Sequence, residues 1–116
     1  MTDAQKLTTV KTLLDDGTGY LPSDDKLNTY LTLAKNEILN WLYWDIGGVP
    51  DNTELPSRYD GVQIYAVIAG YTHAGAEGEQ THIENGVHRH FNYDDMVGYI
   101  RDTRHVTPYV RVGAAT

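Results

Sequence analysis

The chain has 116 residues, 41% of them hydrophobic, and its 16 acidic and 9 basic residues give a net charge of −7. This length predicts a single domain, residues 1–116, and the absence of cysteine excludes disulfides and thiolate chemistry. Sequence-independent nucleic-acid binders need a surplus of Lys and Arg to neutralise phosphates, so the acidic balance argues against that class.

The first predicted element is a helix from Thr2 to Leu14. Apolar residues recur at helical spacing along one stripe, and the Thr2-x-x-Gln5 pattern is typical of a capping box. Asp16-Gly17 supplies a stop signal. The pattern predicts a short helix that packs in a bundle through its one apolar face.

A longer second helix is predicted from Asp24 to Trp44. Ser23 is a good N-cap, and the helix dipole favours Asp24 and Asp25 in the first turn. The apolar residues form a broad stripe that widens beyond one face, so we expect the central core helix of the bundle here. The excess apolar surface suits either tight packing within the bundle or a contact between subunits.

Leu55-Pro56-Ser57 opens a third predicted helix, which ends at Gly75. Its apolar residues cover almost the whole circumference, and helices of that kind are buried. Gly61 and Gly70 would each weaken a solitary helix by roughly 1 kcal/mol. We therefore expect both glycines to allow close packing against a neighbour.

The stretch from Gly75 to Phe91 reads GAEGEQTHIENGVHRHF and holds few core-type residues. Asn85-Gly86 suits a two-residue type I′ turn, in which both central residues adopt positive φ. We predict a small β-hairpin or loop insertion over about residues 76–91 that projects from the helices. Because a lone hairpin is marginal in water, another surface must support it.

Asn92 is the predicted cap of a fourth helix that starts at Tyr93, with two aspartates in its first turn. Pro108 ends any continuation, and alternating apolar residues after it predict an extended C-terminal arm over about residues 106–116. The fold class is therefore mainly α: a small bundle of about four helices with an inserted β-hairpin and this arm.

The histidines of the predicted hairpin are the main candidates for chemistry. In the register set by Asn85-Gly86, His82 shares a face with Glu84 and Arg89, whereas His88 and His90 point the other way. These histidines then cannot converge on one ion within a subunit, so we expect no metal and no cofactor. Ser23 and Ser57 stand at helix starts, where capping explains them. The sequence therefore predicts no enzyme, and a small metal-dependent enzyme using the hairpin histidines stays as an alternative.

Three stretches of the sequence resemble a known protein family. They are GAEG, the T-H-x-E-N-G-V-x-R core from Thr81 to Arg89, and Thr107-Pro108-Tyr109-Val110. Together they resemble the head–tail connector family of long-tailed bacteriophages, whose segment usually reads S-H-S-E-N-G-I-x-R. The resemblance covers about residues 59–112, and the length and order of elements agree with it. Ile83 departs from the usual Ser, and His90-Phe91 from a small-aromatic pair.

The resemblance implies a structural virion protein that forms a ring of about a dozen copies in the neck, between the capsid portal and a stopper or tail-completion protein. DNA would pass through the ring as cargo during packaging and ejection, and the chain could stay monomeric in isolation. No apolar run reaches membrane-spanning length and the N-terminus has no signal-peptide pattern, so we expect synthesis in the host cytoplasm and no membrane partner. A helical DNA-binding regulator is the other alternative.

The candidate interface residues fall into three groups. The hairpin contributes His82, Glu84, Asn85, Gly86 and Arg89. The apolar faces of the second and third helices contribute Trp41, Trp44 and Tyr71, and the basic C-terminal region contributes Arg101, Arg104, Tyr109 and Arg111.

Overall fold

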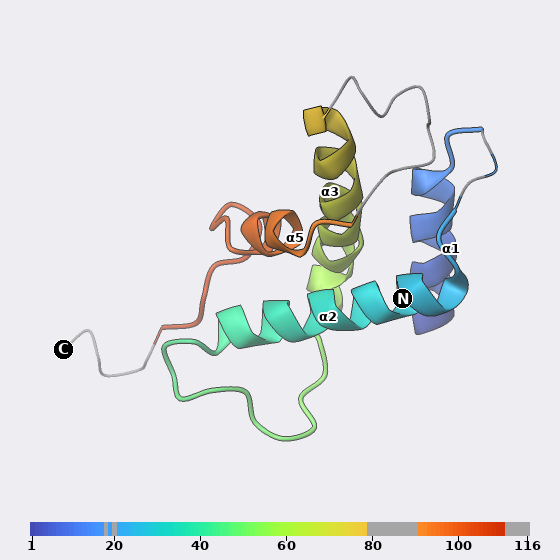
Figure 1. Cartoon of the computed structure of the whole chain (residues 1–116). Coiled ribbons are helices and arrows are strands. Elements are labelled where there is room, and N and C mark those ends of the chain that lie inside the picture. Colours follow the sequence, from blue (N-terminus) through green and yellow to red (C-terminus); the bar gives the residue numbers. More distant parts are fainter. Residues whose placement is uncertain (18, 20, 79–90, 111–116) are drawn as a thin grey trace.

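The computed structural model describes residues 1–17, 19, 21–78 and 91–110, with the backbone alone for residues 72–78. Within these residues the chain forms four α-helices and one 3₁₀ turn, and no strand. They are α1 (Asp3–Leu14), α2 (Asp24–Leu42), η1 (Ser57–Tyr59), α3 (Asp60–Gly78) and α5 (Tyr93–Ile100) (Figure 1). The mainly helical class is confirmed, and the predicted turn at Asn85-Gly86 lies outside the described residues.

The helices α1 and α3 run alongside each other, and α2 crosses both of them (Figure 1). Helix α5 packs against α2 and α3, so α2 and α3 each contact all the other α-helices. The expected central place of α2 is therefore shared with α3. Side chains from all four α-helices fill one core, in which the largest fully buried members are Leu27, Ile38, Leu42, Met96, Ile100, Val10, Val67 and Val106.

Capping fixes the starts of α1, α2 and α5 as predicted, whereas the predicted cap at Ser57 is wrong: Ser57 is the first residue of η1, which has no side-chain cap hydrogen bond. The Thr2 side chain accepts from the Gln5 amide, and the Gln5 side chain accepts from the Thr2 amide, which completes the capping box of α1. Ser23 accepts from the Lys26 amide at the start of α2. Asn92 accepts from the Asp95 amide at the start of α5. These bonds satisfy amide groups that the first turn of a helix leaves without partners.

Helix α2 ends at Leu42, two residues before the predicted end. The Trp44 amide donates to the Trp41 carbonyl, and the Gly48 amide donates back to the Tyr43 carbonyl. Gly47 and Gly48 adopt φ values of 102° and 97°, which glycine tolerates without strain. This turn places Trp44 outside the helix.

Helix α3 continues to Gly78, so the prediction that it ends at Gly75 is wrong. Ala74, Ala76 and Glu77 are good helix formers, and one glycine among them costs only about 1 kcal/mol. The start of the insertion, predicted at residue 76, is corrected accordingly. Its predicted end is corrected as well, because Phe91 belongs to the packed body of the protein.

Phe91 stacks on the ring of Tyr30, with centroids 3.8 Å apart and planes 8° from parallel, and meets Tyr71 edge-on at 5.3 Å. It lies directly over Gly70, where an added Cβ would come within 2.7 Å of the Phe91 ring. The Asn92 amide also donates to the Gly70 carbonyl at 3.2 Å. Close packing at Gly70 thus agrees with the prediction. At Gly61 a Cβ would meet no described atom within 4 Å.

After α5 the chain turns back onto α2. The Trp41 indole donates to the Val106 carbonyl at 2.9 Å, and the Tyr109 amide donates to the Leu42 carbonyl at 2.9 Å. The described part of the predicted arm is thus held to its own subunit, without a strand ladder. None of the described helices is long and apolar enough to cross a membrane.

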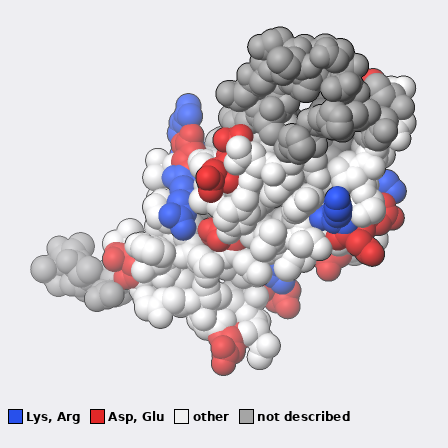
Figure 2. Space-filling view, viewed as in Figure 1, with Lys and Arg blue, Asp and Glu red and all other residues white. Residues whose placement is uncertain are grey.

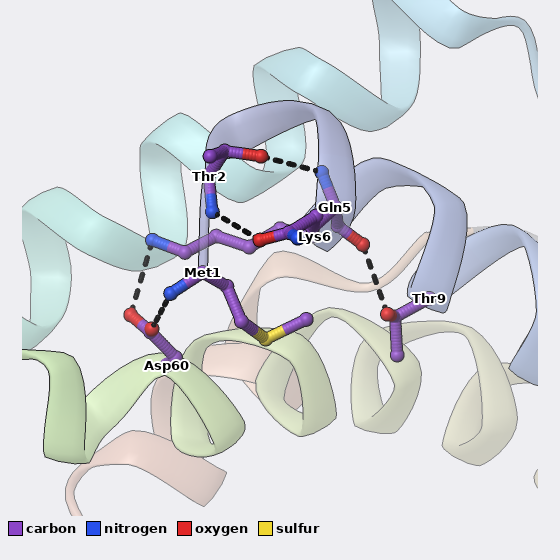
Figure 3. A network of polar contacts seen from close by, with 6 residues as sticks. All are labelled: Met1, Thr2, Gln5, Lys6, Thr9 and Asp60. Carbon is purple, nitrogen blue, oxygen red and sulfur yellow. Dashed lines mark hydrogen bonds and ion pairs between the residues drawn. The ribbon is translucent and has the colours of Figure 1, made fainter.

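A buried ion pair fastens α1 to α3 (Figure 3). The Lys6 ammonium lies 3.2 Å from one carboxylate oxygen of Asp60, and the Met1 amino group lies 2.8 Å from the other. Lys6 is 6% exposed and Asp60 is 7% exposed. Burial by itself would raise the pKa of Asp60, but hydrogen bonds from Met1 and Lys6 outweigh burial and hold that pKa below 3.8.

This lowered pKa predicts a loss of stability in acid. A carboxyl group whose pKa is lower in the folded state than in the unfolded state stabilises the fold above the unfolded value, and the stabilisation disappears as the pH falls through the folded value. The unchanged chain should therefore have a larger free energy of unfolding in urea than Asp60→Asn near neutral pH, and the gap should close as the pH falls below 3.8. A gap of constant size across this range would contradict the prediction.

Candidate interaction surface

Two tryptophans and an arginine form a stack at the C-terminal end of α2. The Arg101 guanidinium, from the residue after α5, lies 5.6 Å from the centroid of the Trp41 ring and 5.7 Å from that of Trp44. Trp44 is 67% exposed and Trp41 is partly buried. A cation over an indole face is attracted by the ring quadrupole, so the three side chains hold one another in place.

Glu37 lies on the same side of α2 and supports this stack. Its carboxylate is 3.6 Å from an Arg101 Nη atom, which is an ion pair but too long for a hydrogen bond. Its other oxygen accepts from the Tyr93 hydroxyl, and this bond raises the pKa of Tyr93 to about 12. Within the described part of the chain no hydrogen bond to the Arg101 guanidinium is found, so its N–H donors are available to a further partner.

A second group of aromatic residues continues the surface towards η1. The Arg58 guanidinium lies 4.8 Å from the centroid of the Tyr59 ring and donates to the Tyr109 hydroxyl at 3.2 Å. Tyr109 in turn meets Tyr43 edge-on, with centroids 5.2 Å apart. The segment after α5 links the two groups, since Trp41 donates to the Val106 carbonyl and the Tyr109 amide donates to the Leu42 carbonyl. We call the combined surface the aromatic–arginine end: Trp41, Tyr43, Trp44, Arg58, Tyr59, Arg101 and Tyr109.

Arg104 follows Arg101 by three residues but is committed to a local pair. Its guanidinium donates to both carboxylate oxygens of Asp102 over 2.7 to 3.2 Å, and its backbone amide donates to the same carboxylate. These bonds, the side-chain ones foremost, hold the pKa of Asp102 well below its usual value. Arg104 therefore fixes the turn after α5.

Basic residues of the two kinds occupy different regions. All arginines that the structure describes contact the aromatic–arginine end or follow α5, whereas the described lysines belong to α1 and α2, at positions 6, 11, 26 and 35. Arginine is enriched and lysine depleted in protein interfaces. On the face shown in Figure 2, acidic and basic residues are interspersed among the described residues, without a broad basic area.

The structure brings together Trp41, Trp44, Arg101 and Tyr109 of the sequence-predicted candidates. Tyr71 is 4% exposed and packs on Tyr30 and Phe91, so this candidate is corrected: its side chain belongs to the interior of the subunit. The candidates outside the described residues are His82, Glu84, Asn85, Gly86, Arg89 and Arg111.

Sequence reasoning missed Glu37, Tyr93 and Arg58. Glu37 could have been found, since positions four and seven residues before Trp41 and Trp44 share a helix face with them. The pairing of Arg58 with Tyr109 spans 51 residues, and no local signal predicts it.

A metal centre finds no support in the described part of the chain, where no group of three His, Asp or Glu side chains could hold an ion. The hairpin histidines, His82, His88 and His90, lie outside that part. His105 is described: its Nδ1 is 2.8 Å from the Tyr99 carbonyl oxygen, and its ring stacks on Tyr99 at 3.8 Å. This histidine therefore packs against its own subunit.

Comparison with known protein families gives a match over residues 4–104 to a model described as phage gp6-like head–tail connector protein. Neither the search of curated proteins nor the search of solved structures finds a match.

Proposed function

Because this chain belongs to the phage gp6-like head–tail connector family, we propose that it forms a ring in the virion neck through which DNA passes. The ring lies between the capsid portal and the stopper or tail-completion protein. The family match over residues 4–104 is the observation that carries this proposal, since it covers all the described helices except the first residue of α1. Membership indicates a structural role in the virion, and we assign no catalytic step to the chain.

The chemistry of the surface supports assembly. A ring needs one face of each subunit to fit a different face of its neighbour. Exposed tryptophan and tyrosine beside arginine are the residue types that carry most of the energy of protein interfaces. The aromatic–arginine end offers such residues: Trp44 is exposed, the tyrosines are half-buried, and Trp44 lies outside the core that the described residues form.

The charge balance supports passage of DNA without adhesion. Attraction between phosphates and cationic side chains is what holds nucleic acid to proteins, and it scales with the number of phosphates neutralised. A net charge of −7 offers no such surplus. A ring of acidic subunits would therefore let the duplex slide.

The proposal is tested by mixing the chain with the portal ring of the same virus and examining the products by electron microscopy and mass photometry. We expect a ring of about a dozen copies on the portal, even where the isolated chain stays monomeric. The matched control is the portal mixed with an unrelated acidic helical protein. Persistent monomers that ignore the portal would overturn the proposal, and salt-sensitive binding of duplex DNA near physiological ionic strength would favour a regulator instead.

A further inference from the structure

We propose that the aromatic–arginine end of one subunit receives the acidic corner of the next copy of the same chain. The acidic corner consists of Asp15 and Asp16 at the end of α1 and Asp24 and Asp25 in the first turn of α2. This inference rests on the proposed ring and names the two surfaces that form its repeating contact.

Trp44 and Arg101 give the receiving face its affinity. Trp44 presents a large apolar surface to solvent, and the Arg101 guanidinium lies over the faces of both indole rings with its side chain 45% exposed. A guanidinium fixed in this way loses little freedom when it binds, and its fork matches a carboxylate through two parallel hydrogen bonds. The site is thus prepared for a carboxylate with apolar atoms beside it.

The acidic corner supplies the matching charge. Lys11 approaches Asp24 at 3.0 Å, which brings the end of α1 against the start of α2. Four exposed aspartates thus belong to these two helix ends, against two lysines, Lys11 and Lys26, and Asp25 has no ion pair among the described residues. Its carboxylate is exposed at the surface. A second copy of this chain always brings such a corner with it, because every subunit carries one.

The two surfaces lie at opposite ends of α2, whose 19 residues span about 28 Å at 1.5 Å per residue. Two copies could satisfy both contacts at once as an antiparallel two-fold dimer, or the contact could repeat from copy to copy until a ring closes. The proposed ring takes the second arrangement. The separation of arginine from acid along one helix is compatible with the heterologous contact that a ring requires, and a closed dimer in place of rings on the portal would overturn this arrangement.

The test measures ring formation on the portal by Trp44→Ala and Arg101→Ala in the full chain. We expect at least about a tenfold loss of assembled rings from each variant, with helical circular dichroism and thermal unfolding kept as fold controls. Tyr65→Ala is the matched control for Trp44, since Tyr65 is an exposed aromatic residue on α3. Arg104→Ala is the matched control for Arg101, since it removes an exposed arginine beyond the tryptophans. Both controls should assemble within about twofold of the unchanged chain.

Charge reversal tests whether the acidic corner of a second copy binds the aromatic–arginine end. Arg101→Glu should abolish ring formation, and adding Asp24→Lys and Asp25→Lys to the same chain should restore it. A photo-crosslinking amino acid at position 44 should join copies of this chain to each other.

Other outcomes decide against the inference in distinguishable ways. Normal rings from Trp44→Ala and Arg101→Ala would overturn it while leaving the ring itself standing. Crosslinks from position 44 to the portal, or failure of the charge reversal to restore rings, would also overturn it. An unchanged chain that never assembles on the portal would remove the proposed function and this contact with it.

Discussion

Asp60→Asn is expected to lower the free energy of unfolding by about 3 kcal/mol, because it leaves the Lys6 ammonium buried without a counter-charge. Lys6 and Asp60 are both almost completely buried, and the carboxylate also holds the Met1 amino group. An asparagine of nearly the same shape keeps the packing but removes the charge. The cost therefore reports the loss of the ion pair and not the creation of a cavity.

The matched control for Asp60→Asn is Asp24→Asn. Asp24 also pairs with a lysine of α1, Lys11, at 3.0 Å, but the Lys11 side chain is 38% exposed and that of Asp24 is 59% exposed. Exposed pairs contribute between about 0 and 1 kcal/mol, so this variant should unfold almost like the unchanged chain. Urea unfolding followed by circular dichroism measures both variants. Equal small effects from the two substitutions would show that Asp60 is not held as a buried ion.

Gly70→Ala should lower the free energy of unfolding by about 2 kcal/mol, since the added methyl group has no room. The new Cβ would lie 2.7 Å from the Phe91 ring and 3.2 Å from the Asn92 carbonyl oxygen. The ring cannot move away freely, because it is stacked on Tyr30 at 3.8 Å. The clash therefore opposes the gain of up to about 1 kcal/mol that alanine brings to a helix interior.

Gly98→Ala is the control for this intrinsic gain. At Gly98 in α5 the added Cβ would meet no described atom within 4 Å, so this variant should be neutral or more stable by up to about 1 kcal/mol. In a Phe91→Ala background, Gly70→Ala should cost less, because the emptied space accepts part of the methyl group. Equal costs with and without the Phe91 ring would show that the contact does not cause the effect.

Local signals in the sequence predict the parts of the fold that depend on local chemistry. The capping box of α1, the Ser23 cap and the Asn92 cap lie as predicted, because each bond joins residues a few positions apart. The predicted end of α3 is wrong because a single glycine among good helix formers does not stop a helix. The packing of Phe91 has no local signal because its partners, Tyr30 and Tyr71, are distant in sequence.

The candidate surface could be predicted only in part for the same reason. The spacing of Trp41 and Trp44 places them near one another at the end of α2, and the excess of apolar residues there suggested a role beyond the core. The position of Arg101 over both rings depends on how α5 packs against α2. The burial of Tyr71 depends on its contact with Phe91, a residue that the sequence pattern places in the insertion.

The chain contains two tryptophans, and both stand beside Arg101. Their ultraviolet emission therefore originates at one place on the molecule, and the exposed ring of Trp44 makes that emission open to quenching by a dissolved solute such as acrylamide. Anything that covers this place should shift the spectrum to the blue and shield it from the quencher. The protein thus carries its own optical reporter, which can follow the arrival of a neighbour in real time without a dye.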